Sequence, residues 1–266
     1  MLNKYDLIIV GAGPSGLFTA YELVKLGIVP GKKVLLVDQG KPVEKRACPI
    51  AKTGKCMKCK PYCMITSGFS GSGAFSDGKL TLISPDAESI EVGGELDRYL
   101  GVDYTKNLIN YTDRIYLKFG ADKKVEGTEF ADERKAIVEK AKANGLTVID
   151  SPIRHLGTEK SHKLFEKVEK YLIDNGIEIA FDTNVIDIVV NSGKISGVIV
   201  QDSYGKTQPR KLFSERVVVG VGRKGASWLT KMCKSHGILS RAGAIDIGVR
   251  YELPDKYMAE VNRLFY

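Results

Sequence analysis

Three glycines near the start of the chain have the spacing of a turn that binds the phosphates of a nucleotide. They form Gly-x-Gly-x-x-Gly directly after a short apolar run that predicts a buried strand. In a dinucleotide-binding unit the first glycine permits a tight turn, the second lets a pyrophosphate approach the backbone, and the third lets the next helix pack on the strand. The start of that helix offers unpaired N–H groups to the phosphates. We therefore predict cofactor contacts at Gly11, Gly13, Pro14, Ser15 and Gly16.

An acidic residue closes the second apolar run. The run Val34–Val37 ends at Asp38, about 20 residues after Gly16, where a carboxylate accepts hydrogen bonds from ribose hydroxyls. We predict that Asp38 and the adjacent Gln39 bind the nucleotide. With Pro14 at the helix start, the segment resembles the first segment of glutathione-reductase-like flavoproteins, which favours FAD over NAD.

Four of the five cysteines lie close together in a lysine-rich segment, with the spacing C-x7-C-x2-C-x3-C: Cys48, Cys56, Cys59 and Cys63. The last three repeat the tail of a bacterial ferredoxin motif, and four thiolates also suit tetrahedral zinc. The nearby lysines would lower the thiol pKa values and offset the negative charge. The pattern predicts a zinc ion or an iron–sulfur cluster; a redox-active dithiol beside the flavin, or reduced thiols without a special role, are the alternatives.

A second Gly-x-Gly-x-x-Gly begins at Gly220, after another apolar run. It has two interpretations. The chain could return here to the FAD sheet and contact the adenosine or pyrophosphate through Gly220, Gly222 and Arg223. Alternatively, it could be a separate NAD(P) site in which Arg223 or Lys224 binds a 2′-phosphate. The alternating apolar residues that precede it predict a β-meander, which favours the first interpretation.

The composition excludes several classes of function. The net charge of +8 suggests nucleic-acid binding, but lysines and acids alternate along the predicted helices, which is typical of solvated faces. No apolar run is long enough to span a membrane. Because the first strand begins at about Tyr5, no signal peptide is expected and the predicted compartment is the cytoplasm. The oligomeric state cannot be predicted.

The elements that would position these residues follow from apolar periodicity. Apolar residues three and four apart predict helices over 14–26, 104–119, 129–144, 161–174 and 226–236. Alternating or continuous apolar runs predict strands over 5–10, 34–37, 146–149, 177–181, 186–190, 195–200, 216–221 and 244–253. The order predicts an α/β fold with a Rossmann-like FAD-binding domain, built from a parallel sheet plus a β-meander, and an inserted second domain. A plain doubly wound domain with an irregular insertion is the alternative.

Five strings, in order, resemble the largely uncharacterised FAD-dependent dehydrogenases of bacteria and archaea, which are related to the glutathione-reductase-like flavoproteins. They are residues 11–16, 71–80, 154–158, 219–223 and 246–250. Such proteins are usually longer, and the Gly-Asp pair that closes their FAD fold is missing here, so the resemblance implies an N-terminal portion. Residues 1–92 and 157–238 are then expected to form the FAD-binding domain, and residues 93–156 and 239–266 a truncated second domain.

The resemblance also implies where the flavin lies. The loop Gly71–Leu80 is expected to run along it, with Gly73 and Ala74 close to the cofactor and Lys79 stabilising negative charge on the ring. Val185 in the meander is expected to contact the cofactor as well. His155 is the second predicted catalytic residue, as a proton donor. An ordinary glycine-rich loop and a histidine at a strand end are the simpler interpretations.

Together these features predict an FAD-dependent oxidoreductase, linked to NAD(P)H, whose small-molecule substrate or electron acceptor is unknown. Two other classes of protein stay open. One is an electron-transfer or metal-binding module built on the segment Cys48–Cys63, and the other is a non-catalytic protein that binds FAD or NAD.

Overall fold

The computed structural model describes residues 1–75, 78–83, 96–241, 243 and 247–265. The chain divides into two compact units, which are described separately. The first combines Met1–Ser76 with Ser161–Gly243, and the second combines Asp77–Lys160 with Ala244–Tyr266. The domain boundaries predicted from the sequence lie after residues 92, 156 and 238.

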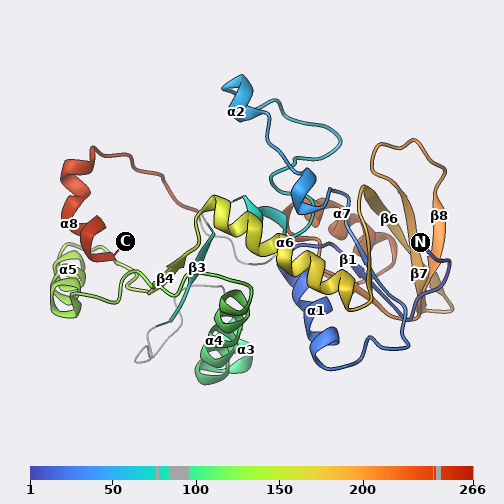
Figure 1. Ribbon diagram of the computed structural model, residues 1–266, viewed down its shortest axis with the longest axis horizontal. Helices are drawn as coiled ribbons and strands as arrows, with labels where there is room; N and C mark the ends of the chain where they lie inside the picture. Colours follow the sequence, from blue (N-terminus) through green and yellow to red (C-terminus); the bar gives the residue numbers. More distant parts are fainter. Residues whose placement is uncertain (76–77, 84–95, 242, 244–246, 266) are drawn as a thin grey trace. The chain divides into compact units, whose positions relative to one another are not determined.

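A parallel four-stranded sheet is the centre of the first unit (Figure 1). Its strand order is β5-β2-β1-β9, and the strands are β1 Leu7–Val10, β2 Val34–Val37, β5 Ile177–Ala180 and β9 Val217–Val219. Helix α1, Pro14–Lys25, connects β1 to β2, and β9 returns from late in the chain to pair in parallel with β1. This arrangement confirms the predicted α/β fold with a Rossmann-like unit.

The strands of this sheet are apolar on both faces because both faces are covered. Ile8 and Val10 of β1 belong to a core shared with the meander, whereas the side chain of Ile9 faces α1, close to Gly16. All three are at most 4% exposed. Burial on two sides removes the alternation seen in half-exposed strands, which is why the sequence reads as a continuous apolar run.

The predicted meander is an antiparallel three-stranded sheet. Its strands are β6 Thr183–Asn191, β7 Lys194–Asp202 and β8 Arg210–Phe213; the third strand was not predicted. Val185, Val198 and Leu212 pack in the same core as β1 and β2. Helix α7, Gly222–Ser235, adds Trp228 and Met232 to this core, and it begins four residues earlier than predicted.

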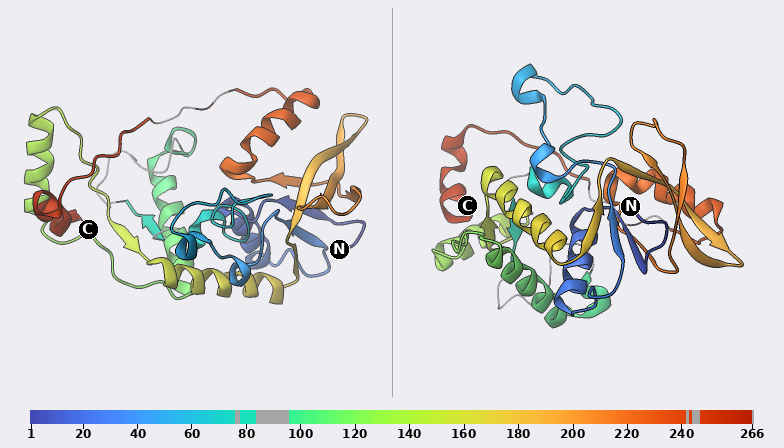
Figure 2. Two further views of the ribbon diagram at one scale, coloured as in Figure 1. Left: turned by 90° about the horizontal axis from the view of Figure 1, so that it is seen from above. Right: turned by 45° about the vertical axis from the view of Figure 1, so that its right-hand side comes forward.

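Helix α6, Thr158–Asp174, runs beside α1 (Figure 2). The Tyr171 ring of α6 contacts the Tyr21 ring of α1, with 5.7 Å between the centroids. The buried α6 residues Leu164, Phe165, Val168 and Leu172 recur every three or four positions, as predicted.

The second unit is mainly helical. Its helices are α3 Leu96–Leu100, α4 Val102–Lys118, α5 Ala131–Ala143 and α8 Asp255–Phe265. The strands β3, Lys79–Thr81, and β4, Ile153–His155, form an antiparallel pair. The short helix α2, Ile50–Thr53, belongs to the first unit, with 3₁₀ turns at Val43–Lys45 and Gly71–Ala74.

Two predicted strands are wrong. Residues 146–149 and 247–253 form no strand; residues 244–246 lie outside the described part. In the second segment Ile247, Val249 and Tyr251 are 90%, 86% and 84% exposed. Their alternation suits a strand, but a strand needs a hydrogen-bonded neighbour, and the described residues provide none for this segment.

Candidate dinucleotide-binding site

Two of the three glycines in the first turn are required by the protein itself. Gly11 has φ +96°, and a Cβ there would lie 2.6 Å from the Gly220 carbonyl oxygen. A Cβ on Gly16 would lie 1.8 Å from the Gly11 carbonyl oxygen. These contacts are shorter than any real packing distance, so both positions need glycine for the turn and the helix to form.

Gly13 is different, because nothing in the protein restricts it. A Cβ at Gly13 would meet no atom within 4 Å, and its φ of −71° and ψ of −175° suit any residue. The missing side chain therefore leaves open space in front of the backbone. Such a position needs glycine only if something outside the chain approaches it.

The N-terminus of α1 faces this space without a protein cap. Gly13 is the N-cap residue, no side chain caps the helix, and the first turn holds no acidic residue. The unpaired N–H groups and the positive end of the helix dipole are therefore available to an anion. The arrangement suits a phosphate group.

A cavity of about 600 Å³ lies at this helix end. Gly13 and Ser15 line it, as do Gly71 and Ser72 of a later loop. A second cavity, of about 250 Å³, shares Gly11, Asp38, Gln39, Val221 and Lys224 with it. Because they share these residues, the two cavities adjoin at the carboxyl ends of β1 and β2. Together they are called the elongated cavity.

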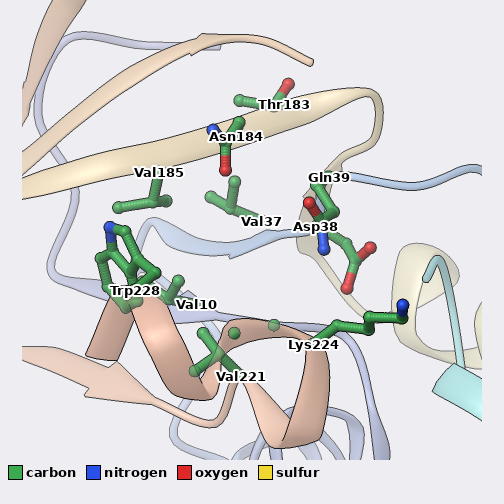
Figure 3. Close-up of a pocket in the computed structure, with 12 residues that line it drawn as sticks. Val10, Val37, Asp38, Gln39, Thr183, Asn184, Val185, Val221, Lys224 and Trp228 are labelled. Atoms are coloured by element: carbon green, nitrogen blue, oxygen red, sulfur yellow. The ribbon is translucent and has the colours of Figure 1, made fainter. Parts of the chain in front are cut away.

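The smaller cavity has an apolar end and a polar end (Figure 3). Val185 of β6 and Trp228 of α7 lie at the apolar end, and Asp38, Gln39 and Lys224 lie at the polar end. Val185 thus takes a place in the cavity wall. Trp228, Thr183 and Asn184 also line it but were not predicted, because the meander had no motif that marked its inner face.

Asp38 is at the predicted place, but its carboxylate already has three partners. Oδ2 accepts a hydrogen bond from Ala12 N at 2.8 Å, and Oδ1 accepts from Gly40 N at 2.7 Å and Gly68 N at 2.8 Å. The side chain therefore ties the glycine turn to the end of β2 and to the loop before Gly71. Gln39, whose Nε2 donates to Ser67 Oγ at 3.3 Å, also lines the cavity.

A buried arginine holds the loop that forms the far wall. Arg46 is 3% exposed and its guanidinium lies over the Phe75 ring, 4.6 Å from the centroid. Burial lowers its pKa to about 10, an effect that the nearby Asp38 carboxylate partly offsets. Its donors reach four carbonyl oxygens, on Met64, Ile65, Phe69 and Gly71. No sequence pattern indicates this role, since Arg46 stands among lysines in an irregular segment.

The second glycine cluster belongs to the same cavity as the first. Gly220 N donates to the Val10 carbonyl oxygen at 2.8 Å, because β9 pairs with β1. Gly220, Gly222, Arg223 and Lys224 all line the larger cavity. Among the described residues no further strand pairs beside β9, so the arrangement agrees with a return to the first sheet rather than a separate nucleotide unit.

The four clustered cysteines share one cavity, of about 480 Å³. Cys56 is exposed and the other three are partly buried, and all four are free thiols. Within the described part of the chain, no group of three or more His, Cys, Asp or Glu side chains is placed to hold a metal ion. The structure therefore brings the cysteines to one cavity without assembling a single-ion site.

The two predicted catalytic residues are neighbours in the second unit. Lys79 of β3 pairs in register with His155 of β4; Lys79 is exposed and His155 is partly buried. In the predicted flavin loop, Gly71 and Ser72 line the larger cavity, Ala74 is fully buried, and a Cβ on Gly73 would meet Ser70 and Phe165. Residues 76–77 of this loop lie outside the described part.

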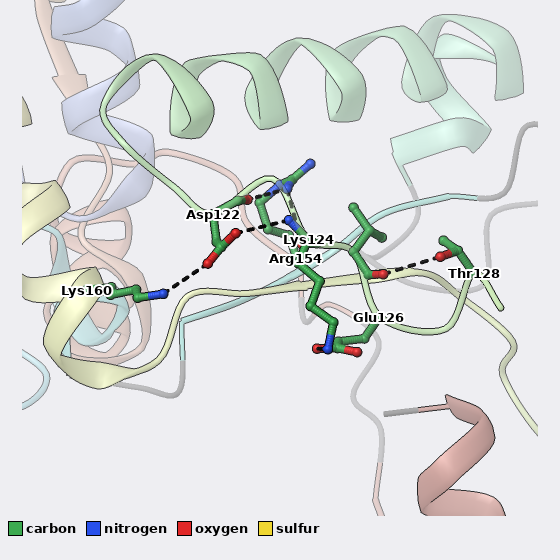
Figure 4. A network of polar contacts seen from close by, with 7 residues as sticks. Asp122, Lys124, Glu126, Thr128, Arg154 and Lys160 are labelled. Carbon is green, nitrogen blue, oxygen red and sulfur yellow. Dashed lines mark hydrogen bonds and ion pairs between the residues drawn. The ribbon is translucent and has the colours of Figure 1, made fainter.

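Arg154, beside His155, has a structural role. Its guanidinium donates to both carboxylate oxygens of Asp113, at 2.5 and 2.8 Å, and to the carbonyl oxygens of Asp122 and Lys124. Lys160 pairs with the Asp122 carboxylate at 3.0 Å (Figure 4). The Asp113 carboxylate raises the pKa of Arg154. The arginine is therefore occupied by partners within the second unit.

Comparison with known proteins bears on the first unit most directly. Residues 9–43 match the family model of the NAD(P)-binding Rossmann-like domain. An uncharacterized protein of Clostridium beijerinckii is 24% identical over 256 residues, which is 96% of this chain and 38% of that protein. The chain thus spans well under half the length of this relative.

Two solved structures resemble the chain at low identity. The THI4 protein of Thermovibrio ammonificans is 14% identical, with a TM-score of 0.44, over 87% of this chain and 63% of that one. Glycine oxidase of Bacillus cereus is 19% identical, with a TM-score of 0.43, over 87% of this chain and 59% of that one.

Among the described helices, none has the length and apolar character needed to cross a membrane.

Proposed function

We propose that the chain binds FAD in the elongated cavity and belongs to an FAD-dependent oxidoreductase. The observation that carries the proposal is the difference between the glycines. Gly11 and Gly16 are needed for the fold, whereas a Cβ at Gly13 would meet no protein atom and would only enter the space before the α1 N-terminus. A pyrophosphate fits both the space and the uncapped N–H groups.

The shape of the cavity supports a dinucleotide rather than an isolated phosphate. From the α1 N-terminus it extends toward Val185 and Trp228, which offer apolar walls to an adenine. It also extends toward Gly71 and Ser72, in the loop predicted to follow the flavin. FAD carries adenosine on one side of its pyrophosphate and the flavin on the other. The adenosine would extend toward Val185 and Trp228, and the flavin toward Gly71 and Ser72.

Charge along the cavity supports an anionic ligand. The charged side chains that line the larger cavity are Asp38, Arg223 and Lys224. Because Asp38 is already bonded to three N–H groups, the two basic residues are the ones left to face a ligand. They would offset the two negative charges of a pyrophosphate, and Gln39 would be the neutral contact for the ribose.

Bound flavin would supply hydride or electron transfer, as in other flavoproteins. The chain would contribute binding and charge. Lys79 and His155, as paired neighbours on β3 and β4, are proposed to act together, the lysine as a positive charge and the histidine as a proton donor. NAD(P)H as the reductant follows from the resemblance alone, and the acceptor is not identified.

A valine in place of Gly13 tests the proposal. Gly13→Val should leave the fold intact, since its Cβ meets no protein atom, but it fills the space that the pyrophosphate needs. We expect FAD affinity to fall by about tenfold to a hundredfold or more, because overpacking costs about 1–3 kcal/mol. The measurement is the quenching of flavin fluorescence on titration, with circular dichroism to monitor the fold.

Gly248→Val is the matched control. Gly248 is equally open to a Cβ and is not among the residues that line either cavity, so this change should leave FAD affinity unaltered. Equal affinity of the Gly13→Val and wild-type proteins for FAD would place the cofactor elsewhere and overturn the proposal. Binding of NAD but not FAD by the wild type would instead support a nicotinamide-binding protein.

A further inference from the structure

A third cavity in the first unit is lined by sulfur-containing side chains. Six of its lining residues are Cys48, Cys56, Met57, Cys59, Cys63 and Met64. This concentration of thiols and thioethers in one place is what soft metal centres require, since thiolate and thioether ligands select zinc, copper(I) and iron–sulfur clusters. The proposed FAD cavity does not use any of these side chains.

The charges around the sulfur-lined cavity fit an anionic centre. Lys58, Lys60 and Lys224 line it, and none of its described lining residues is acidic. Four thiolates around a cluster leave a net negative charge, which desolvation would make unfavourable without nearby cations. The three ammonium groups provide that compensation.

The segment that carries most of the cysteines is not held by regular backbone hydrogen bonding. In the described structure, no backbone–backbone hydrogen bond involves residues 55–62. Figure 1 shows this stretch, together with α2, as a loop projecting from the layered body of its unit. Tyr62 anchors the end of the loop, because its hydroxyl donates to Asp182. A metal centre that tied the loop together would break no backbone bond in doing so.

The spacing of the cysteines favours a cluster over a single ion. Cys56, Cys59 and Cys63 repeat the C-x2-C-x3-C tail of a bacterial ferredoxin motif. Within the described residues, no group of three or more potential ligands is placed around a single ion. The structure does bring these three cysteines and Cys48 to one cavity of about 480 Å³.

We propose that Cys48, Cys56, Cys59 and Cys63 bind a polynuclear iron–sulfur cluster. The cavity that would hold it shares Gln39, Ser67 and Lys224 with the larger cavity at the α1 N-terminus. A one-electron centre would therefore lie beside the proposed cofactor. The proposal does not depend on FAD binding, because the cysteine cavity is defined by its own residues.

The test is anaerobic reconstitution of the full chain with ferrous iron and sulfide, followed by gel filtration. We expect iron and acid-labile sulfide in equal amounts, about two to four of each per chain. Cys59→Ser should lose most of both. Cys233→Ser is the matched control, since this cysteine lies on α7 outside the cavity, and it should retain both.

Flavin content measured on the same samples separates the two proposals, because loss of the cluster should leave FAD binding in place. If the chain takes up zinc alone through the same cysteines, the centre is a single ion and the cluster proposal is wrong. If it takes up neither metal, and the four thiols are alkylated at the same rate before and after reconstitution, there is no metal site.

Discussion

Single residues determine how the proposed cofactor site is built, and Asp38 is the clearest case. The sequence predicted a ribose ligand, whereas the structure shows a carboxylate that holds three backbone N–H groups from separate parts of the chain. An acid at the end of β2 can thus shape the phosphate turn itself. The prediction of ribose binding is not tested by this arrangement, but it is no longer needed to explain the residue.

Asp38→Ala should lower the stability of the protein without any ligand. The change leaves the N–H groups of Ala12, Gly40 and Gly68 without their acceptor, and an unsatisfied buried partner costs about 1–3 kcal/mol or more. Urea unfolding of the cofactor-free protein measures this. An unchanged midpoint for Asp38→Ala, with weaker FAD binding, would instead restore the role in ribose binding alone.

Glu169 on α6 gives a prediction about pH. Burial, with Glu44 and Glu166 nearby, raises the pKa of its carboxyl, while Val43 N donates to Oε2 at 3.0 Å. A raised folded-state pKa means that the folded protein holds this proton at pH values where the unfolded chain, with a pKa of about 4.3, has lost it. The stability from this group is therefore present at low pH and lost as pH rises through the folded-state pKa.

Glu169→Gln keeps the acceptor oxygen and removes the charge. We expect the variant to match the wild type in stability near pH 4 and to exceed it near neutral pH. Urea unfolding at both pH values is the measurement, with the exposed Glu215→Gln as control. A variant that is less stable than the wild type at neutral pH would show that the ionised carboxylate is needed.

At the scale of elements, the loop after Cys63 is held by one buried side chain. Arg46 reaches four carbonyl oxygens of this loop, and a lysine has neither the planar fork nor enough donors to replace it. Arg46→Lys should cost about 1–3 kcal/mol of stability. Faster hydrogen exchange should follow at residues 64–71, with weaker FAD binding.

Arg114→Lys is a suitable comparison, because this arginine lies in the second unit over the Tyr111 ring. It should leave exchange in the loop unaltered. If Arg46→Lys also leaves exchange and FAD affinity unaltered, the loop is held by its other contacts and the far wall of the cavity does not depend on Arg46.

The elements that were predicted well from the sequence have a regular pattern of buried residues. A strand buried on both faces reads as a continuous apolar run, and a helix buried on one face has apolar residues three and four apart. The strands β1, β2 and β5 and the helices α1 and α6 are cases of this kind, as is the glycine turn between β1 and α1. The strands predicted at 146–149 and 247–253 are wrong because an apolar pattern shows that a segment can pair and not whether a neighbour exists. Arg46 and Trp228 were missed because their roles depend on partners far apart in sequence.

At the scale of the whole molecule, the two units carry different parts of the proposed function. The glycine turns, the cavities and the cysteines lie in the first unit, and Lys79 and His155 lie in the second. The chain spans 38% of the length of its relative from Clostridium beijerinckii. The complete reaction, its substrate and its partners are therefore proposals.

The exposed segment 247–251 of the second unit gives a prediction about association. Ile247, Val249 and Tyr251 are nearly fully exposed, and exposed apolar side chains favour contacts between molecules. The double change Ile247→Ser with Val249→Ser should reduce association measured by light scattering, and FAD affinity should stay the same. Unchanged association in the double variant would show that this segment is not the contact surface.

The occupancy of the elongated cavity is the most direct test of the central claim. The cofactor-free chain is incubated with FAD, separated from free ligand by gel filtration, and its visible absorption is compared with its protein concentration. We predict about one FAD per chain for the wild type, as expected of one dinucleotide-binding unit, and little for Gly13→Val. A wild-type chain that retains no flavin, or a Gly13→Val chain that retains as much as the wild type, would contradict the claim.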